Sequence, residues 1–344
     1  MARRRENGVT IRAVAERAGV SAMTVSNVIN GAGRASATTV ATVQAAIAEL
    51  GYVPNLAARR LAKARATTVG LIYSNRRTPF LDAVLVGSLR ATNANGLQLI
   101  LRDGDGVTLD EAERIAQELV RSGADALLLI PPFAEQLSGS AILPALGVPF
   151  AAIATGTPLS GISTVRIDNQ AAMEALTRRV IADGHRRIAY VAGPDHYSVV
   201  AARLDGFYAA LQDAGLRVDD SLIVEHSAFD HASGMAAAQA LLARPDRPTA
   251  ILCSSDDLAA GVIAQAGQMG LTLPHDLSVT GFADTTLASR VWPPLTVIRQ
   301  PVEDMAFRAT QCLIGALGKG GMRVSDEIFD HQLVQRASIA PAST

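Results

Sequence analysis

Residues 9–30 read VTIRAVAERAGVSAMTVSNVIN and carry the pattern of two short helices joined by a tight turn. In the first, Ile11–Ala18, apolar side chains recur at spacings of three and four residues and so share one helical face. Gly19 then ends that helix, because glycine readily adopts the left-handed conformation that follows a helix. Ser21 stands at the N-cap position of a second helix, Ala22–Asn30. The stretch therefore predicts a helix-turn-helix.

The residues that follow predict a third helix, from about Thr38 to Leu50, which Gly51 ends. Its apolar stripe consists of Val43, Ala46, Ile47 and Leu50. In the second helix, the side chains assigned to the core of this small unit are Val25, Val28 and Ile29. A further short piece, Leu56–Ala62, follows Pro54 and is rich in Ala and Arg.

Charge is distributed unevenly along the chain. The 344 residues carry a formal net charge of −1 at pH 7. Residues 1–66, however, hold ten Arg and Lys against three acidic residues, a net +7, and the remainder holds 21 basic and 29 acidic residues, a net −8. Such segregation is typical of a polyanion-binding module attached to an acidic globular body. A solvated basic tail is the alternative interpretation.

From Thr67 onward, apolar runs of five or six residues alternate with amphipathic helical segments. The apolar runs are 68–73, 97–101, 126–130, 148–153, 187–192, 249–253 and 277–282. The helical segments between them include 108–121, 169–183, 200–214 and 257–269. This alternation predicts a doubly wound α/β body, with parallel strands and crossover helices on both faces. Because the body exceeds the size of a typical single core, we expect two subdomains.

Composition excludes several classes of protein. With 49% hydrophobic residues the chain can bury a large core, which excludes a disordered or collagen-like protein. No run approaches the ~18 apolar residues of a membrane span, and no apolar signal segment follows the N-terminal arginines. We therefore expect a soluble cytoplasmic protein without a membrane contact. Cys253 and Cys312 each lie in an apolar stretch, which fits reduced thiols rather than a disulfide.

The motifs of common enzymes are missing from the sequence. Gly31-Ala32-Gly33 lacks the third glycine of a dinucleotide-binding loop and follows a predicted helix rather than a strand. Ser163 lacks the second glycine of a nucleophile elbow, and no P-loop string occurs. The six histidines are scattered, and neither cysteine has the spacing of a zinc ligand. We therefore expect no metal, no cofactor and a function other than catalysis.

Two stretches, 9–30 and 46–61 (AIAELGYVPNLAARRL), strongly resemble the DNA-binding region of the lactose-repressor (LacI/GalR) family of bacterial transcription regulators. The resemblance continues in collinear order through the body, in 165–169 (VRIDN), 184–193 (GHRRIAYVAG), 203–207 (RLDGF), 256–261 (DDLAAG), 270–274 (GLTLP) and 294–301 (PLTVIRQP). It thus covers nearly the whole chain.

The resemblance implies a domain organisation. Residues 1–53 would form the helix-turn-helix headpiece and 54–66 a hinge helix with its linker. The body would be a type I periplasmic-binding-protein-like domain in which the chain crosses three times between two subdomains. The N-subdomain would hold 67–166 and 296–325, and the C-subdomain would hold 167–295 and 326–344.

The resemblance also implies which residues contact DNA. The second helix would lie in the major groove, with base edges read by Ala22, Met23 and Asn27. Contacts to the DNA backbone would come from Thr24, Ser26, Asn30, Ser36 and Thr39. In the hinge, Asn55, Arg59 and Arg60 would contact DNA, and Leu61 would insert between base pairs in the minor groove. The alternatives are that Met23 is a packing residue and that Leu61 packs against the body.

Candidate effector-binding residues follow from the same resemblance: Ser74, Phe80, Asp168, Arg203, Phe229, Ser255, Asp256 and Asp284. Two positions depart from sugar-responsive members of the family. Ser255 stands where they often carry Asn, and Ala283 stands where they carry Asp, with Asp284 only in the next position. A carboxylate accepts two hydroxyl hydrogen bonds and alanine accepts none, which puts a typical pyranose contact in doubt. Near the cleft rim, Arg76 and Arg77 would favour an anionic effector, unless they belong to a solvated loop.

These observations favour a homodimeric transcriptional repressor that binds a palindromic operator in double-stranded DNA and responds to a small metabolite, such as a sugar or sugar acid. The chain's last residues carry no leucine heptads, so we expect a dimer rather than a coiled-coil tetramer. When bound to DNA, such a protein would associate with the nucleoid. The rival interpretation is a solute-binding protein with the same body fold and no regulatory role, and an enzyme is the third.

Overall fold

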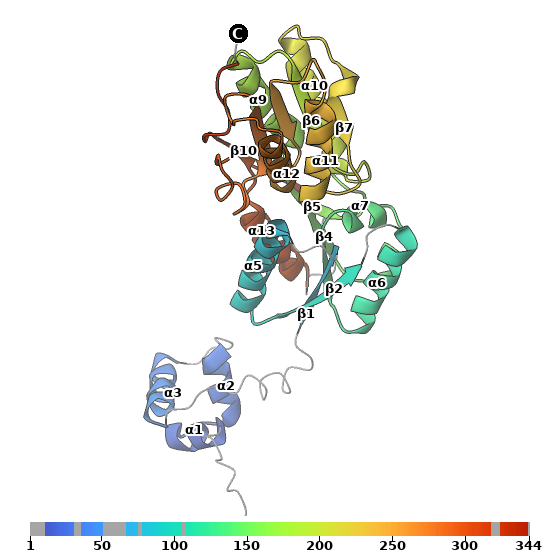
Figure 1. Ribbon diagram of the computed structural model, residues 1–344. Helices are drawn as coiled ribbons and strands as arrows, with labels where there is room; N and C mark the ends of the chain where they lie inside the picture. The colour runs from blue at the N-terminus through green and yellow to red at the C-terminus, as the bar shows by residue number, and fades with distance from the viewer. Residues whose placement is uncertain are drawn as a thin grey trace, which may run out of the picture. The chain divides into compact units, whose positions relative to one another are not determined.

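The computed structural model describes residues 11–30, 36–50, 67–74, 78–104, 108–317 and 324–342 (Figure 1). Contacts within the chain divide it into two compact units, residues 1–66 and 67–344. Each unit has a hydrophobic core of its own.

In its described ranges, 11–30 and 36–50, the first unit is a cluster of three helices, α1 (Ile11–Ala18), α2 (Ala22–Asn30) and α3 (Ala37–Leu50), which confirms the predicted helix-turn-helix. Gly19 has a φ of +66°, the left-handed conformation expected between the first two helices. The buried core consists of Val14, Ala15, Val25, Val43 and Ala46. A salt bridge of 2.7 Å from Arg17 Nη2 to Glu49 Oε2 joins α1 to α3. The predicted core residue Ile29 has a side chain outside the described part of the structure.

The second unit contains two six-stranded sheets, which confirms the predicted α/β body. The first sheet is entirely parallel and has the strand order β11-β5-β4-β3-β1-β2. Its strands are β1 (Thr68–Ser74), β2 (Gln98–Gly104), β3 (Ala126–Leu129), β4 (Phe150–Ile153), β5 (Ser163–Ile167) and β11 (Asp326–Phe329). We call this sheet and the helices packed on it the N-subdomain.

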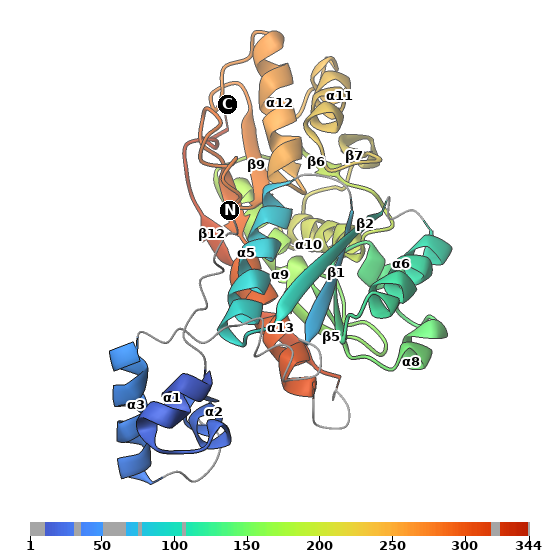
Figure 2. The same cartoon turned by 90° about the horizontal axis from the view of Figure 1, so that it is seen from below.

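Helices cover both faces of the first sheet. In Figure 2, α5 (Pro79–Ala94) and α13 (Val302–Ala316) lie side by side on one face. The other face is covered by α6 (Leu109–Arg121), α7 (Phe133–Leu137) and α8 (Ile142–Leu146). This layering explains why the strands are so apolar, since all four residues of β3 and of β4 are buried.

The second sheet has the order β12-β10-β9-β8-β6-β7 and, with its helices, forms the C-subdomain. Its strands are β6 (Ile188–Ala192), β7 (Ile223–Glu225), β8 (Ala250–Cys253), β9 (Ser278–Ala283), β10 (Thr296–Arg299) and the antiparallel β12 (Gln332–Val334). One face is covered by α9 (Asn169–Ala182) and α10 (Ser198–Asp213), and the other by α11 (His231–Leu242) and α12 (Asp256–Gln268). A short 3-10 helix, Asp220–Leu222, precedes β7.

The strand pairing corrects two assignments of the expected subdomain boundaries. Strand β10 pairs with β9, with Thr296 opposite Thr280, so it belongs to the C-subdomain and not to the N-subdomain. Strand β11 pairs with β5, so 326–329 belongs to the N-subdomain and not to the C-subdomain. The physical reason is burial, because the first three residues of β10 are buried and form backbone hydrogen bonds with β9 and β12. The chain crosses between the subdomains after β5, after β10 and after β11.

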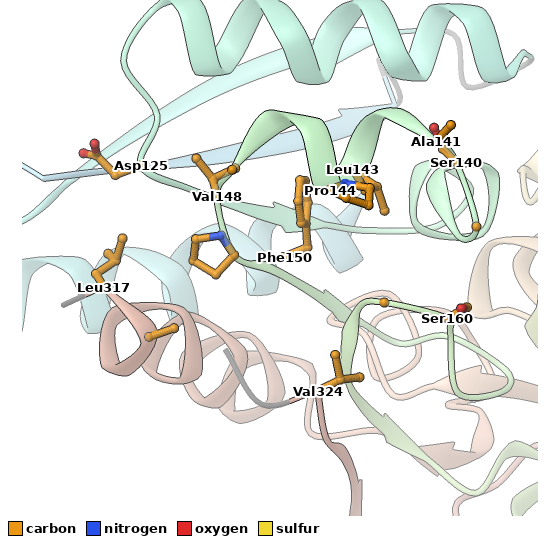
Figure 3. Close-up of a pocket in the computed structure, with 15 residues that line it drawn as sticks. Asp125, Ser140, Ala141, Leu143, Pro144, Val148, Phe150, Ser160, Leu317 and Val324 are labelled. Carbon is orange, nitrogen blue, oxygen red and sulfur yellow. The ribbon is translucent and has the colours of Figure 1, made fainter. Parts of the chain in front are cut away.

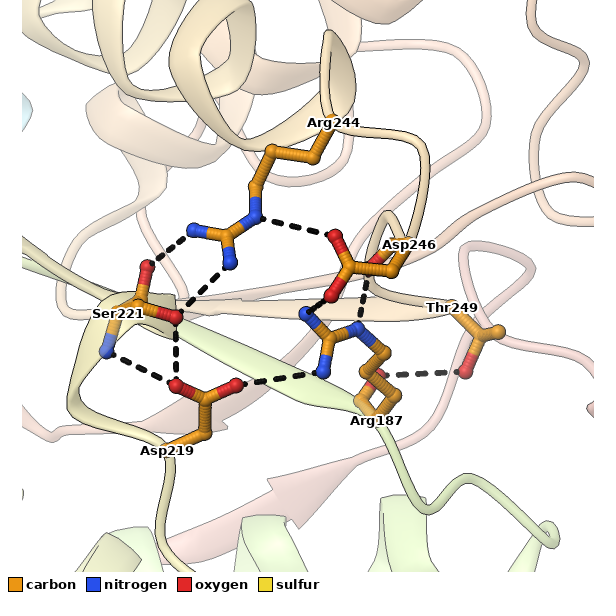
Figure 4. A network of polar contacts seen from close by, with 6 residues as sticks. All are labelled: Arg187, Asp219, Ser221, Arg244, Asp246 and Thr249. Carbon is orange, nitrogen blue, oxygen red and sulfur yellow. Dashed lines mark hydrogen bonds and ion pairs between the residues drawn. The ribbon is translucent and has the colours of Figure 1, made fainter.

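A polar network holds the end of the second sheet at which β6 begins (Figure 4). Arg187 forms salt bridges with Asp219 at 3.2 Å and with Asp246 at 2.6 Å. Arg244 donates to the backbone oxygen of Ser221 at 3.0 Å and to its Oγ at 2.9 Å. The network ties the segment before β7 and the turn before β8 to the start of β6. It lies at the opposite end of the strands from their carboxyl ends, and its role is structural.

Both cysteines are free thiols, as predicted, with Cys253 buried and Cys312 half-buried. None of the helices in the described ranges is long and apolar enough to cross a membrane.

Candidate nucleic-acid interface and ligand cleft

The N-terminus of α2 is capped by a side chain and presents exposed groups. Ser21 Oγ accepts a hydrogen bond from the backbone N–H of Thr24 at 3.1 Å and lies 2.9 Å from Thr24 Oγ1. Met23, in the first turn of the helix, is 71% exposed, more than a core residue of so small a unit would be. The structure therefore does not support packing within its own unit as the role of Met23.

The N-terminus of α3 repeats this arrangement. Ser36 Oγ accepts from the N–H of Thr39 at 3.2 Å and lies 2.8 Å from Thr39 Oγ1. The first turn of a helix combines N–H groups that lack an intrahelical partner with the positive end of the helix dipole, and it therefore favours phosphate groups. The first unit thus has two similarly capped helix starts that can bind a polyanion.

The other residues predicted to contact DNA are less accessible or lie outside the description. Ala22 is half-buried and packs against the small core, and Asn27 is half-buried on α2. The side chains of Ser26 and Asn30 lie outside the described part of the structure, as do the whole residues Asn55, Arg59, Arg60 and Leu61. The assignments of these six residues stay predictions.

A cavity of about 250 Å³ lies between the N-subdomain and the C-subdomain. Six of the eight predicted effector residues line it: Ser74, Phe80, Arg203, Phe229, Ser255 and Asp256. These residues are 182 positions apart at the extremes, from Ser74 to Asp256, and the fold brings them together at the carboxyl ends of strands. Ligands of open parallel sheets bind at this edge.

Arg203 is the buried cation of this cavity. It lies on α10, and its Nε donates to Asn169 Oδ1 at 2.8 Å while its Nη1 donates to the backbone oxygen of Ser254 at 2.6 Å. The guanidinium carbon stands 3.7 Å from the ring centroid of Phe282, a cation–π contact. Burial lowers the pKa of Arg203 to about 10, so the side chain stays charged at neutral pH. Among the described residues Nη2 forms no hydrogen bond, so it can donate one to a ligand.

Asp256 supplies a buried acceptor. It begins α12 and is 1% exposed, and its Oδ2 accepts from the N–H of Thr285 at 2.7 Å. Its Oδ1 is buried and has no hydrogen-bond partner within the described ranges. Burial raises the pKa of Asp256 to about 7. The neighbouring Ser255 is the N-cap of α12, with its Oγ accepting from the N–H of Leu258 at 3.2 Å, so the hydroxyl hydrogen remains free to be donated to a ligand.

Aromatic side chains form the apolar walls. Phe229 and Tyr197 of the C-subdomain pack edge to face, with ring centroids 5.2 Å apart. Phe80, from the start of α5, lines the cavity from the N-subdomain. Sequence reasoning missed Tyr197, although its place just after the carboxyl end of a buried strand is a signal that could have identified it.

Two predicted effector residues, Asp168 and Asp284, do not line the cavity, and their assignments stay predictions. Asp168 is exposed, does not line the cavity, and caps α9 by accepting from the N–H of Ala171 at 3.0 Å. The Asp284 carboxylate forms salt bridges with Arg299 at 2.7 Å and Arg336 at 2.6 Å. Arg76 and Arg77, the candidates for an anion site, lie outside the described residues.

A second hollow, of about 900 Å³, lies on the N-subdomain near the starting ends of β3 and β4 (Figure 3). Leu143, Phe150 and Val324 contribute to its largely apolar lining. Asp125 is the one charged side chain among the described lining residues, and its carboxylate already accepts from the N–H of Thr68 at 2.8 Å. The described part of this lining therefore lacks unpaired buried polar groups like those beside the cavity between the subdomains. In the described part of the chain no cluster of His, Cys, Asp and Glu side chains is arranged to hold a metal ion.

Comparison with protein families matches two regions of the chain. Residues 10–55 match the model described as bacterial regulatory proteins, lacI family. Residues 177–339 match the model of a periplasmic binding protein-like domain.

Individual relatives match over most of their length. The chain is 35% identical over 318 residues to the HTH-type transcriptional regulator CelR of Thermobifida fusca, covering 89% of this chain and 91% of that protein. It is 34% identical over 308 residues to the ribose operon repressor of Escherichia coli (strain K12), covering 89% and 92%. A solved structure of a transcriptional regulator CelR–cellobiose complex superposes with a TM-score of 0.71 at 32% identity, covering 96% of this chain and 99% of the other.

Proposed function

Because the chain belongs to the LacI family of bacterial transcriptional regulators, we propose that α2 reads an operator while a small neutral saccharide in the cleft controls that binding. The observation that carries the effector half of the proposal is that a buried guanidinium, Arg203, and a buried carboxyl, Asp256, both line the cavity. We take the protein to be a repressor, as the ribose operon repressor is named to be.

For DNA, the proposal is a dimer that places one α2 in each half of a two-fold symmetric site. Asn27 suits an adenine edge, which it can bond in two places, and the exposed Met23 suits a thymine methyl group. The capped starts of α2 and α3 would receive phosphates through Thr24 and Ser36 and so set the register. Arg59, Arg60 and Leu61 would add minor-groove and backbone contacts. The protein would act in the cytoplasm and associate with the nucleoid when bound to DNA.

For the effector, charge and size point to an uncharged molecule with several hydroxyl groups. Arg203 can donate to a hydroxyl oxygen, and Asp256 can accept a hydroxyl hydrogen, so together they match a polyol. Asp257 also lines the cavity, so among the described lining residues a carboxylate or phosphate ligand would meet two acidic side chains and a single arginine. Phe229 offers an aromatic face to the apolar side of a sugar ring.

The size of the cavity favours a single ring. About 250 Å³ is somewhat below the usual volume of ligand pockets, roughly 300–1,000 Å³, so we propose a monosaccharide rather than a disaccharide. The related CelR structure holds cellobiose, which has two rings. Ala283 lines the cavity at the position where sugar-responsive members of the family carry Asp, and it lacks one polar contact that a larger sugar could use.

The two halves of the proposal are linked by thermodynamics. An effector can change operator affinity only if it binds the DNA-bound and the free protein with different affinity. A ligand between the subdomains has this property if it favours one relative arrangement of the two, because closing a hinge moves the N-subdomain against the C-subdomain.

Selection of bound duplexes from a random DNA pool, repeated at several salt concentrations, tests the DNA half. We expect a two-fold symmetric site whose binding weakens steeply with salt, because each phosphate contact releases counterions. Failure to enrich any symmetric sequence, with and without the saccharides below, would overturn the proposal.

Thermal shift and calorimetry with a saccharide panel test the effector half. The panel contains glucose, galactose, mannose, ribose and xylose, the disaccharides cellobiose and maltose, and the anions gluconate and glucose 6-phosphate. We expect a neutral monosaccharide to bind more tightly than any other compound. Preferential binding of an anion or a disaccharide would contradict the proposed effector class.

A further inference from the structure

A polar contact joins the two subdomains beside the cavity. Ser198, the first residue of α10 in the C-subdomain, donates its hydroxyl hydrogen to Glu135 Oε1 at 2.6 Å. Its Oγ accepts in turn from the backbone N–H of Gly156 at 2.7 Å. Glu135 lies on α7 and Gly156 follows β4, so both belong to the N-subdomain. We call these three residues the clasp.

The clasp is part-buried and closely packed. Glu135 Oε2 is buried with no hydrogen-bond partner in the described structure, and burial raises the pKa of this carboxyl above its usual range. A Cβ placed on Gly156 would stand 2.2 Å from the backbone oxygen of Ser198, so only glycine permits this approach. Hydrogen bonds to a desolvated carboxylate are among the stronger ones in proteins. The clasp therefore stabilises the arrangement in which the two subdomains meet here.

The clasp is next to the cavity but is not part of its lining. Tyr197 and Val199, the neighbours of Ser198 in the sequence, both line the cavity, and Arg203 lies on the same helix. Glu135, Gly156 and Ser198 do not line it. A bound molecule would thus leave the clasp contacts in place, while the clasp fixes the distance between the walls that enclose that molecule.

We propose that the clasp is an effector-independent lock on subdomain closure, and that it sets the affinity of the cleft for its effector without contacting it. The effect of the clasp on affinity rests on the proposed function, because it requires an effector that binds between the subdomains. A ligand enclosed by both subdomains binds the closed form, so its apparent affinity scales with the population of that form. Breaking the clasp lowers this population, and the affinity falls by the same factor.

The first test measures amide hydrogen exchange of the full chain without any saccharide. In Ser198→Ala we expect faster exchange in segments 154–157 and 194–200, which face each other from the two subdomains. Loss of one hydrogen bond without opening would accelerate exchange at Gly156 alone, and that result would overturn the lock. The matched control is Ser140→Ala, because Ser140 also donates to a carboxylate, that of Glu113, but both residues lie in the N-subdomain. We expect the control to leave both cleft segments unchanged.

The second test measures the affinity of the same variants for the panel monosaccharide that binds the unmodified chain most tightly. Ser198→Ala should weaken binding about tenfold, the usual size of a hydrogen bond to a charged group, and Ser140→Ala should not. Glu135→Gln keeps an acceptor for the Ser198 hydroxyl and should retain affinity within about threefold. Unchanged affinity in Ser198→Ala would overturn the claim that the clasp sets affinity.

The two tests separate the failure of this proposal from the failure of the proposed function. If no saccharide binds the unmodified chain, the proposed effector class is wrong, and the exchange experiment still decides whether the clasp locks the subdomains.

Discussion

The two subdomains have similar architecture but contribute differently to the cleft. Each is a six-stranded sheet with helices on both faces. Among the described lining residues, the C-subdomain supplies the charged groups, Arg203, Asp256 and Asp257, and the rings of Phe229 and Phe282. The N-subdomain supplies mainly apolar lining: Phe80, Leu81, Ile130, Pro131 and Ala154, with the hydroxyls of Ser74 and Thr78. The C-subdomain therefore provides most of the polar groups that can recognise a ligand, and the N-subdomain mainly encloses it.

This division suits an allosteric protein. The N-subdomain begins at residue 67, directly after the DNA-binding unit in the sequence. A ligand held mainly by the C-subdomain can therefore influence DNA binding through how the N-subdomain closes on it.

Replacing the buried cation should abolish effector binding. In Arg203→Met we expect calorimetry to show at least a hundredfold loss of monosaccharide affinity, because the donor to the ligand disappears. Asn169 Oδ1 and the oxygen of Ser254 lose their partner, so the free energy of unfolding should also fall, by about 2 kcal/mol. Arg217→Met, at an exposed arginine of the same subdomain, is the control and should change neither quantity. Retained affinity in Arg203→Met would mean that the C-subdomain does not dominate recognition.

Asp256→Asn should weaken binding and stabilise the fold at the same time. We expect about a tenfold loss of monosaccharide affinity at pH 8, since the amide is a weaker acceptor than the carboxylate. Burial raises the pKa of Asp256 to about 7, which is above the value of an unfolded chain. The charged form therefore destabilises the folded state above pH 7, and this penalty disappears as the pH falls through 7 toward 4.

Removing that charge should raise the melting temperature of Asp256→Asn at pH 8 by about 2–4 °C, and by much less at pH 5. Asp205→Asn, at an exposed carboxyl of the same subdomain, is the control and should leave the melting temperature unchanged at both pH values. An Asp256→Asn variant that loses stability at pH 8 would contradict the assignment of Oδ1 as an unpaired acceptor.

The N-subdomain should tolerate loss of a wall residue better. Phe80→Ala removes apolar contact but no hydrogen bond, so we expect calorimetry to show about a fivefold loss of monosaccharide affinity. Leu109→Ala, at an exposed residue of the same subdomain, should have no effect. A larger loss in Phe80→Ala than in Arg203→Met would reverse the comparison between the subdomains.

The smallest expected effect concerns a contact found in the C-subdomain. His185 is buried, with Nδ1 2.8 Å from Thr249 Oγ1 and Nε2 3.0 Å from the backbone oxygen of Ala340, and so ties the chain's last segment to the sheet. Burial lowers the pKa of His185, so the neutral form is favoured in the fold and its stabilisation is lost as the pH falls below about 6.5.

His185→Gln removes this titration. Chemical denaturation at pH 7.5 and pH 5.5 should show a smaller loss of stability on acidification than the unmodified chain shows, by up to about 1 kcal/mol. An identical loss in both proteins would show that His185 does not titrate in this range.

Much of the fold could be predicted from the sequence because its signals are local. The helices of the first unit follow from apolar spacing and from Gly19 and Ser21, and the seven long apolar runs all contain strands. The sheets to which β10 and β11 belong could not be predicted. Strand β11 alternates exposed and half-buried residues, and its partner β5 lies 159 residues earlier in the chain, counted from Ile167 to Asp326. Pairing over such a distance depends on the whole fold.

The site was partly predictable for a similar reason. Arg203 and Asp256 lie in stretches that resemble the family, and the structure places both at the cavity. Asp168 and Asp284 lie in such positions too, but a helix cap and two arginines engage their carboxylates. The contact between Glu135 and Ser198 joins residues 63 positions apart, and no motif or spacing in the sequence indicated it.

The most direct test of the account is the affinity of the full chain for its selected operator, measured by fluorescence anisotropy at constant salt with and without the monosaccharide. We expect the monosaccharide to change the operator affinity of the unmodified chain at least fivefold, within the usual range of allosteric coupling. We expect it to leave the operator affinity of Arg203→Met unchanged. Operator affinity that stays constant while the saccharide is shown to occupy the cleft would contradict the account.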